Sequence, residues 1–153
     1  MKNIDEWLTL YGRDHQNPTN KLIHWFCVPA IMFAVLGLLW CIPFHPYEWL
    51  NISTIFYSFA LIFYLRLSFP IFLGFIVIGG LMLYTNAALF NHFGTSTYAY
   101  ILLGVFVVAW IFQFVGHKIE GQKPSFFEDL QFLLIGPAWL MHFVFKKIGI
   151  KYN

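Results

Sequence analysis

Long apolar runs constrain the fold of this 153-residue chain more than any other feature. A helix that crosses the hydrocarbon core of a bilayer needs about 20 mostly apolar residues. Charged residues make up only 10% of the chain, and a chain this short has too little interior to hide so much apolar surface from water. The sequence therefore predicts an all-α, integral membrane helical bundle, with a single domain over residues 1–153 and about four transmembrane helices. The predicted spans are approximately residues 25–43, 52–69, 70–91 and 98–116.

The connections and partners of these spans are also constrained. The second and third spans are joined only by the stretch from Arg66 to Pro70, which predicts a tight helical hairpin. Gly79 and Gly80 lie in the middle of the third span and predict close helix packing.

The formal net charge is only +2, and the basic residues form no run, so we expect no nucleic-acid partner. Membrane lipid is an expected partner, and an oligomer is compatible with the sequence.

Residues 128–145 form a further apolar stretch, interrupted by Gly136 and Pro137. They could be a fifth span or a broken helix in the interface. Loops 44–51 and 92–97 carry no Lys or Arg. All nine basic residues therefore fall on one side if 128–145 does not cross, and the positive-inside rule makes that side cytoplasmic. We predict a C-terminal re-entrant or interfacial helical segment and a cytoplasmic N-terminus, in the bacterial inner membrane or, for a eukaryotic protein, the endoplasmic reticulum.

This topology divides the six histidines between the two sides of the membrane. His45 and His92 lie in the loops without cations. The other four gather at the cytoplasmic face: His15, His24, His117 and His142.

Two helices are predicted to carry polar stripes into this face. Pro18 suits the first position of a helix capped by Asn17. Asn17, Asn20 and His24 then share an arc of about 60°. Gln113, His117 and Glu120 have the same spacing at the end of the fourth span.

A metal ion would be the chemical reason to gather these groups. Neutral imidazole suits Fe, Zn and Cu, and two histidines with one carboxylate are a common Fe(II) arrangement. Neighbouring amides and carboxylates would fix the ring tautomers. Each side chain also has an ordinary explanation, since interfacial histidines are often solvated, Asn17 is a helix cap and Gln113 can bond a neighbouring helix. The residues alone leave both interpretations open.

Two motifs carry a family resemblance. YGRDHQNPTNKLIHWFCVP at residues 11–29 and QFVGHKIEGQKP at 113–124 resemble the 2-hydroxy fatty acid dioxygenase family of small multi-span membrane proteins. The resemblance implies an Fe(II)-dependent dioxygenase of fatty acid α-oxidation. Such an enzyme uses O2 to convert a long-chain 2-hydroxy fatty acid to the acid one carbon shorter. The conserved histidines of the family correspond to His15, His24 and His117, and Glu120 lies in the second motif.

The leading hypothesis is therefore a dioxygenase with a histidine-rich Fe(II) site at the cytoplasmic interface. The predicted catalytic residues are His15, His24, His117 and Glu120. The predicted metal ligands are His15, His24, His117 and His142. Residues expected to orient the ligands or contact substrate are Arg13, Asp14, Asn17, Asn20, Lys21 and Gln113, with Arg13 or Lys21 pairing the substrate carboxylate. The alternatives are a non-enzymatic membrane lipid-binding or assembly protein and a zinc-dependent membrane hydrolase.

Overall fold

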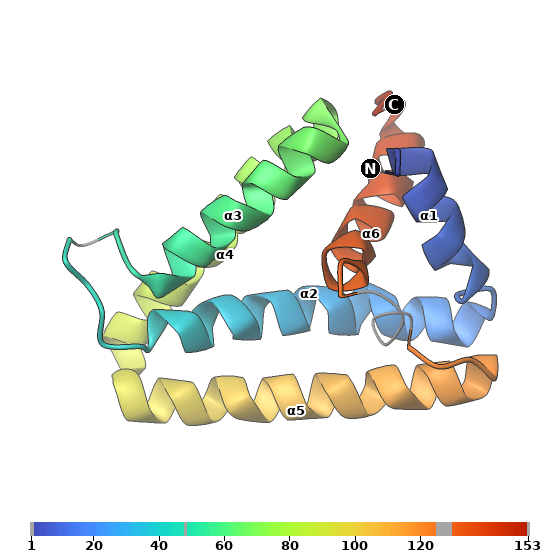
Figure 1. The fold of residues 1–153 in the computed structure, drawn as a ribbon. Coiled ribbons are helices and arrows are strands. Elements are labelled where there is room, and N and C mark those ends of the chain that lie inside the picture. Colours follow the sequence, from blue (N-terminus) through green and yellow to red (C-terminus); the bar gives the residue numbers. More distant parts are fainter. Residues whose placement is uncertain (1, 48, 125–129, 153) are drawn as a thin grey trace.

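In the residues that it describes, 2–47, 49–124 and 130–152, the computed structural model contains six α-helices and no β-strand (Figure 1). The expected all-α fold is confirmed. The helices are α1 Ile4–Arg13, α2 Pro18–Trp40, α3 Ile52–Leu67, α4 Phe69–Phe93, α5 Thr95–Glu120 and α6 Phe132–Ile148.

Three of these helices, α2, α4 and α5, are long and apolar enough to cross a membrane. The predicted second span, 52–69, corresponds to α3, which is apolar but has only 16 residues. At a rise of 1.5 Å per residue it is about 24 Å long, shorter than a hydrocarbon core of about 30 Å. The count of four spans therefore stays a prediction.

α2 begins where its sequence predicts. The Asn17 side chain accepts hydrogen bonds from the backbone N–H groups of Thr19 (2.9 Å) and Asn20 (3.5 Å), and Pro18 occupies the first position of the helix. α2 then runs antiparallel to α5 (Figure 1). The two helices approach closely at Gly116, where an added Cβ would lie 2.4 Å from Asn20 Oδ1. This contact brings the C-terminal end of α5 against the N-terminal end of α2.

α3 and α4 form the predicted tight hairpin, with Ser68 as the residue between them. Gly79 permits the close packing expected of it, since an added Cβ would lie 1.8 Å from Tyr57 Oη. Gly80 does not, because an added Cβ there would meet nothing within 4 Å. The expectation for Gly80 was therefore wrong, because that residue lies on a different face of α4.

α6 packs against α1 and α2 and stays helical through Pro137. The broken helix, one of the two alternatives for 128–145, is therefore absent, and the segment is helical over Phe132–Ile148; its first residues, 128 and 129, lie outside the described ranges. A re-entrant or interfacial position for it stays a prediction. Tyr64 of α3 donates a hydrogen bond of 2.9 Å to the carbonyl of Leu134, in the turn before Pro137.

Candidate metal centre

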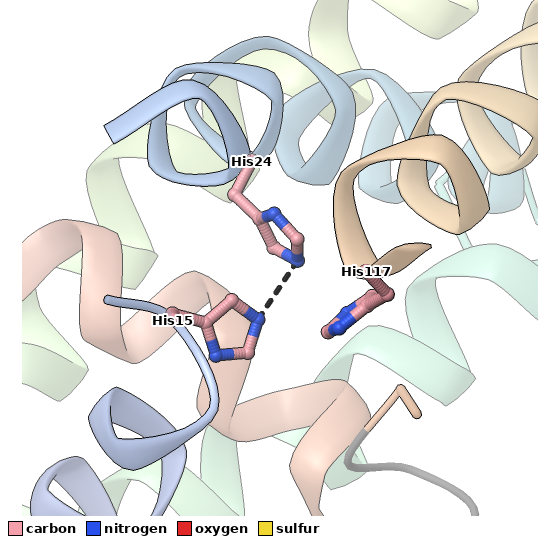
Figure 2. A group of neighbouring side chains, drawn as sticks. All are labelled: His15, His24 and His117. Atoms are coloured by element: carbon pink, nitrogen blue, oxygen red, sulfur yellow. Dashed lines mark hydrogen bonds between the residues drawn. The ribbon is translucent and has the colours of Figure 1, made fainter. Parts of the chain in front are cut away.

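Three buried histidines from three segments meet at the cytoplasmic end of the predicted topology (Figure 2). His15 lies between α1 and α2, His24 lies in α2, and His117 lies near the end of α5. Their exposed fractions are 0%, 1% and 4%. Each offers a ring nitrogen within 4.8 Å of the other two. The structure thus brings together the three histidines that the two sequence motifs indicated.

Backbone carbonyls fix the tautomers of two of these rings. His15 Nδ1 lies 2.6 Å from the carbonyl oxygen of Tyr11, and His24 Nδ1 lies 2.9 Å from that of Asn20. A carbonyl oxygen only accepts, so both Nδ1 atoms carry the proton. In the neutral rings, both Nε2 atoms therefore present a lone pair.

These two lone pairs face each other. His15 Nε2 and His24 Nε2 are 2.9 Å apart (Figure 2). Two lone pairs repel at this distance unless a cation lies between or beside them. Burial lowers the pKa of His15 below its usual 6.5, so a proton is a poor candidate at neutral pH. The geometry fits a metal cation bound to neutral imidazoles.

His117 completes the donor set. Its ring centroid lies 4.9 Å from that of His15 and 5.0 Å from that of His24. Its Nδ1 is buried and has no hydrogen-bond partner among the described residues. A buried polar nitrogen without a partner is costly, and a metal ion would remove that cost. Three imidazoles suit Fe, Zn or Cu, and the donor set by itself does not choose among them.

Tyr11 is a part of this centre that was not among the site residues predicted from the sequence. Its ring stacks on His15 with centroids 4.1 Å apart, while its carbonyl accepts from the same residue. Gly136 of α6 leaves room for it, because an added Cβ there would lie 2.9 Å from Tyr11 Oη. Burial raises the pKa of Tyr11 well above its usual value, which keeps the phenol neutral. Its spacing of four residues before His15 was the available signal.

The carboxylate of Glu120 accepts hydrogen bonds from the α1–α2 loop. It accepts from the backbone N–H of Gln16 at 2.7 Å and that of Asn17 at 2.9 Å. It also accepts from Asn20 Nδ2 at 3.0 Å. Asn17 and Asn20 therefore lie beside the centre, where the Asn17 side chain caps α2 and the Asn20 side chain bonds Glu120. These contacts hold the segment that carries His15 and His24.

The remaining predicted site residues lie outside the three-histidine group. His142 is not in the three-histidine group, and its Nδ1 is hydrogen-bonded to the hydroxyl of Tyr152. Arg13 Nε donates to Asp14 at 2.9 Å, and the Arg13 side chain is 60% exposed. Lys21 is half-buried. Gln113 is buried and lines the cavity described next.

A cavity of about 290 Å³ extends from the centre into the helical bundle. His24, Gln113 and His117 contribute polar groups to its wall, together with Tyr11. Most of the remaining lining comes from apolar residues of α2, α3, α5 and α6. The arrangement can therefore accommodate a ligand with a polar group at the histidines and a long apolar tail.

Comparison with known proteins supplies independent information. The sequence model of the family described as "2-hydroxy-palmitic acid dioxygenase Mpo1-like" matches residues 1–148. The chain is 35% identical over 149 residues to the 2-hydroxy-palmitic acid dioxygenase MPO1 of Saccharomyces cerevisiae, covering 95% of this chain and 82% of the yeast protein. No solved structure matches the chain.

Proposed function

The chain belongs to the 2-hydroxy-palmitic acid dioxygenase Mpo1-like family, and from this premise we propose that it is an Fe(II)-dependent 2-hydroxy fatty acid dioxygenase of fatty acid α-oxidation. The reaction cleaves the C1–C2 bond of a long-chain 2-hydroxy acid. The substrate and O2 give the acid one carbon shorter, carbon dioxide and water. C1 and C2 together lose four electrons, which the two atoms of O2 gain, so no external reductant is needed.

The observation that carries this proposal is the contact between His15 Nε2 and His24 Nε2 at 2.9 Å. Both nitrogens bear lone pairs because both Nδ1 atoms donate to carbonyls. Together with His117, they would hold the Fe(II) of the proposed enzyme, and this ion would supply the redox chemistry for O2.

The residues of the chain prepare this site. The carbonyls of Tyr11 and Asn20 orient His15 and His24, as hydrogen bonds to the second ring nitrogen do in metal sites. Burial of the three rings excludes bulk water from the reacting groups. Gln113 lies on α5 one turn from His117 and lines the same cavity, so its amide is suited to donate to the substrate carboxylate. The acyl chain then extends into the apolar part of the cavity.

The test is metal analysis and turnover on the same preparations. The full-length protein, purified in detergent and loaded with Fe(II), should hold iron and convert 2-hydroxypalmitic acid to pentadecanoic acid under oxygen. His24→Ala and His117→Ala should lose both properties while keeping their helical content. His92→Ala, on the exposed opposite end, is the control and should keep both.

Other outcomes would favour the alternatives. Three imidazoles also bind zinc in catalytic sites, so retained zinc without oxygen consumption would indicate a hydrolase instead. Equal metal content in the wild type and both histidine variants, with reduced stability of the variants, would indicate structural polar contacts in a non-enzymatic protein.

A further inference from the structure

The cavity is polar at one end and apolar along its length. α2 lines it with one face, on which His24, Val28 and Val35 follow one another. α5 lines it with Phe106, Gln113 and His117. The two helices are antiparallel (Figure 1), so His24 lies near His117, and Val35 lies at the level of Phe106.

The distance along the helices between the histidines and the pair Val35 and Phe106 gives the length of the cavity. Val35 follows His24 by 11 residues, and Phe106 precedes His117 by the same number. At 1.5 Å per residue the cavity is therefore about 16 Å long. Half of a hydrocarbon core of about 30 Å is about 15 Å, which is the depth filled by one acyl chain of a bilayer leaflet. The cavity thus has the length of a long-chain acyl group.

α3 borders the end of the cavity far from the histidines. α3 begins beside the C-terminal part of α2 and diverges from it toward its own C-terminus (Figure 1). Leu36 of α2 and Tyr57 of α3 lie in one buried cluster and are 1% and 4% exposed. Phe56 of α3 lines the cavity at this level. Val35, Phe56 and Phe106 are thus among the residues that line the cavity farthest from the histidines.

We propose that this cavity selects substrates by acyl-chain length, and that Val35, Phe56 and Phe106 set the upper limit. The nature of the ligand rests on the proposed function, whereas the limiting residues come from the shape of the cavity. A chain of about leaflet length fills the space between the histidines and Val35. A shorter chain leaves apolar wall uncovered, and a longer chain must bend or leave the cavity.

The test uses four variants of the full-length protein in lipid nanodiscs, as purified and kept under nitrogen so that bound acid is not consumed. Binding of 2-hydroxyoctanoic, 2-hydroxylauric, 2-hydroxypalmitic and 2-hydroxytetracosanoic acids is measured by competition with radiolabelled 2-hydroxypalmitic acid. The variants are Val35→Phe, Val28→Phe, Phe106→Ala and Val107→Phe. Val107 lies on the same helix as Phe106, is 46% exposed and does not line the cavity, so it serves as the control.

The wild type should bind 2-hydroxypalmitic acid best. Val35→Phe should weaken the binding of 2-hydroxypalmitic acid about five- to hundredfold, the range expected for overpacking, while 2-hydroxylauric acid still binds. Val28→Phe, close to the histidines, should also lose 2-hydroxylauric acid. Phe106→Ala should shift the preference toward 2-hydroxytetracosanoic acid, and because it removes atoms it tests the idea even if the larger side chains impair folding. Val107→Phe should match the wild type.

The inference is overturned if Val35→Phe and Val28→Phe weaken all acids equally, or if Phe106→Ala leaves the preference unchanged in folded protein. Its failure is distinguishable from failure of the proposed function. Length-dependent binding that follows these variants, without turnover under oxygen, would support the cavity and reject the dioxygenase. Turnover under oxygen, with a chain-length preference that these variants do not change, would support the dioxygenase and reject the role of the cavity.

Discussion

At the residue scale, Glu120 joins two segments that carry histidines of the candidate metal centre. Its carboxylate accepts from Gln16, Asn17 and Asn20, whereas His117 lies one turn earlier on the same helix. The loop of His15 is thereby tied to the helix of His117. We therefore propose that Glu120 positions these segments, and its catalytic role stays a prediction.

Replacing Glu120 by Gln should loosen the metal centre. The amide offers one acceptor oxygen where the carboxylate has two, so at least one of the three N–H donors, from Gln16, Asn17 and the Asn20 side chain, faces an NH2 group in place of an acceptor. Loss of groups that orient metal ligands typically lowers metal affinity by about 10- to 100-fold, and we expect a reduction in this range by competition with a chelator. Lys118→Gln, an exposed change in the same turn, is the control. Unchanged affinity in Glu120→Gln would rule out the positioning role.

The stability of the metal-free protein should depend on pH through His15. Burial lowers the pKa of His15 in the folded state below its usual value of 6.5, so the unfolded state binds more protons just below pH 6.5. The free energy of unfolding should therefore be level above this pH and fall as the pH decreases through it, by at most about 1.4 kcal/mol per pH unit for this group. Chemical unfolding at several pH values measures the slope. His15→Gln should reduce the slope, and an equal slope in that variant would contradict the assignment.

At the element scale, adjacent glycines in α4 have different environments. Tyr57 donates a hydrogen bond of 2.6 Å to the carbonyl of Phe75, and its hydroxyl lies against Gly79. Gly80 has open space around it. The sequence indicates close packing near this pair, but which glycine faces α3 depends on the rotation of α4 about its axis.

Gly79→Ala should therefore destabilise the hairpin, whereas Gly80→Ala should not. The new methyl group at residue 79 would displace Tyr57, at a cost of about 1–3 kcal/mol from overpacking plus the lost hydrogen bond. At residue 80 the gain in helix propensity of alanine over glycine remains, up to about 1 kcal/mol. Thermal or SDS unfolding of the two variants measures the difference. Similar stabilities would show that α4 is rotated differently.

At the scale of the whole molecule, two groups of helices meet around the candidate metal centre, and the α3–α4 hairpin packs against α2. α2 and α5 run side by side, while α1 and α6 pack together near the N-terminal half of α2 (Figure 1). The three histidines lie where these groups meet. The positive-inside rule predicts that this end faces the cytoplasm.

Cysteine labelling tests this orientation. In a background with Cys27→Ala and Cys41→Ala, Gln122→Cys should react with a membrane-impermeant maleimide only after the membrane is opened. Ser96→Cys, in the first turn of α5 on the side predicted to lack cations, should react in intact cells. Both residues are exposed. The reverse pattern would place the metal centre on the outer side.

The sequence by itself determined the helical class, the start of α2 and the tight hairpin, and it indicated that His15, His24 and His117 come together. These features depend on apolar length, local capping and fixed helical spacing. It did not determine that α6 continues through Pro137, that Glu120 holds the α1–α2 loop, or that Tyr11 stacks on His15. Those features depend on which side chains meet across helices far apart in the chain. Only the tertiary structure decided them, since helix packing fixes the rotation of each helix and the distance between helices. The same packing places the lone pairs of His15 and His24 face to face and leaves a cavity beside them.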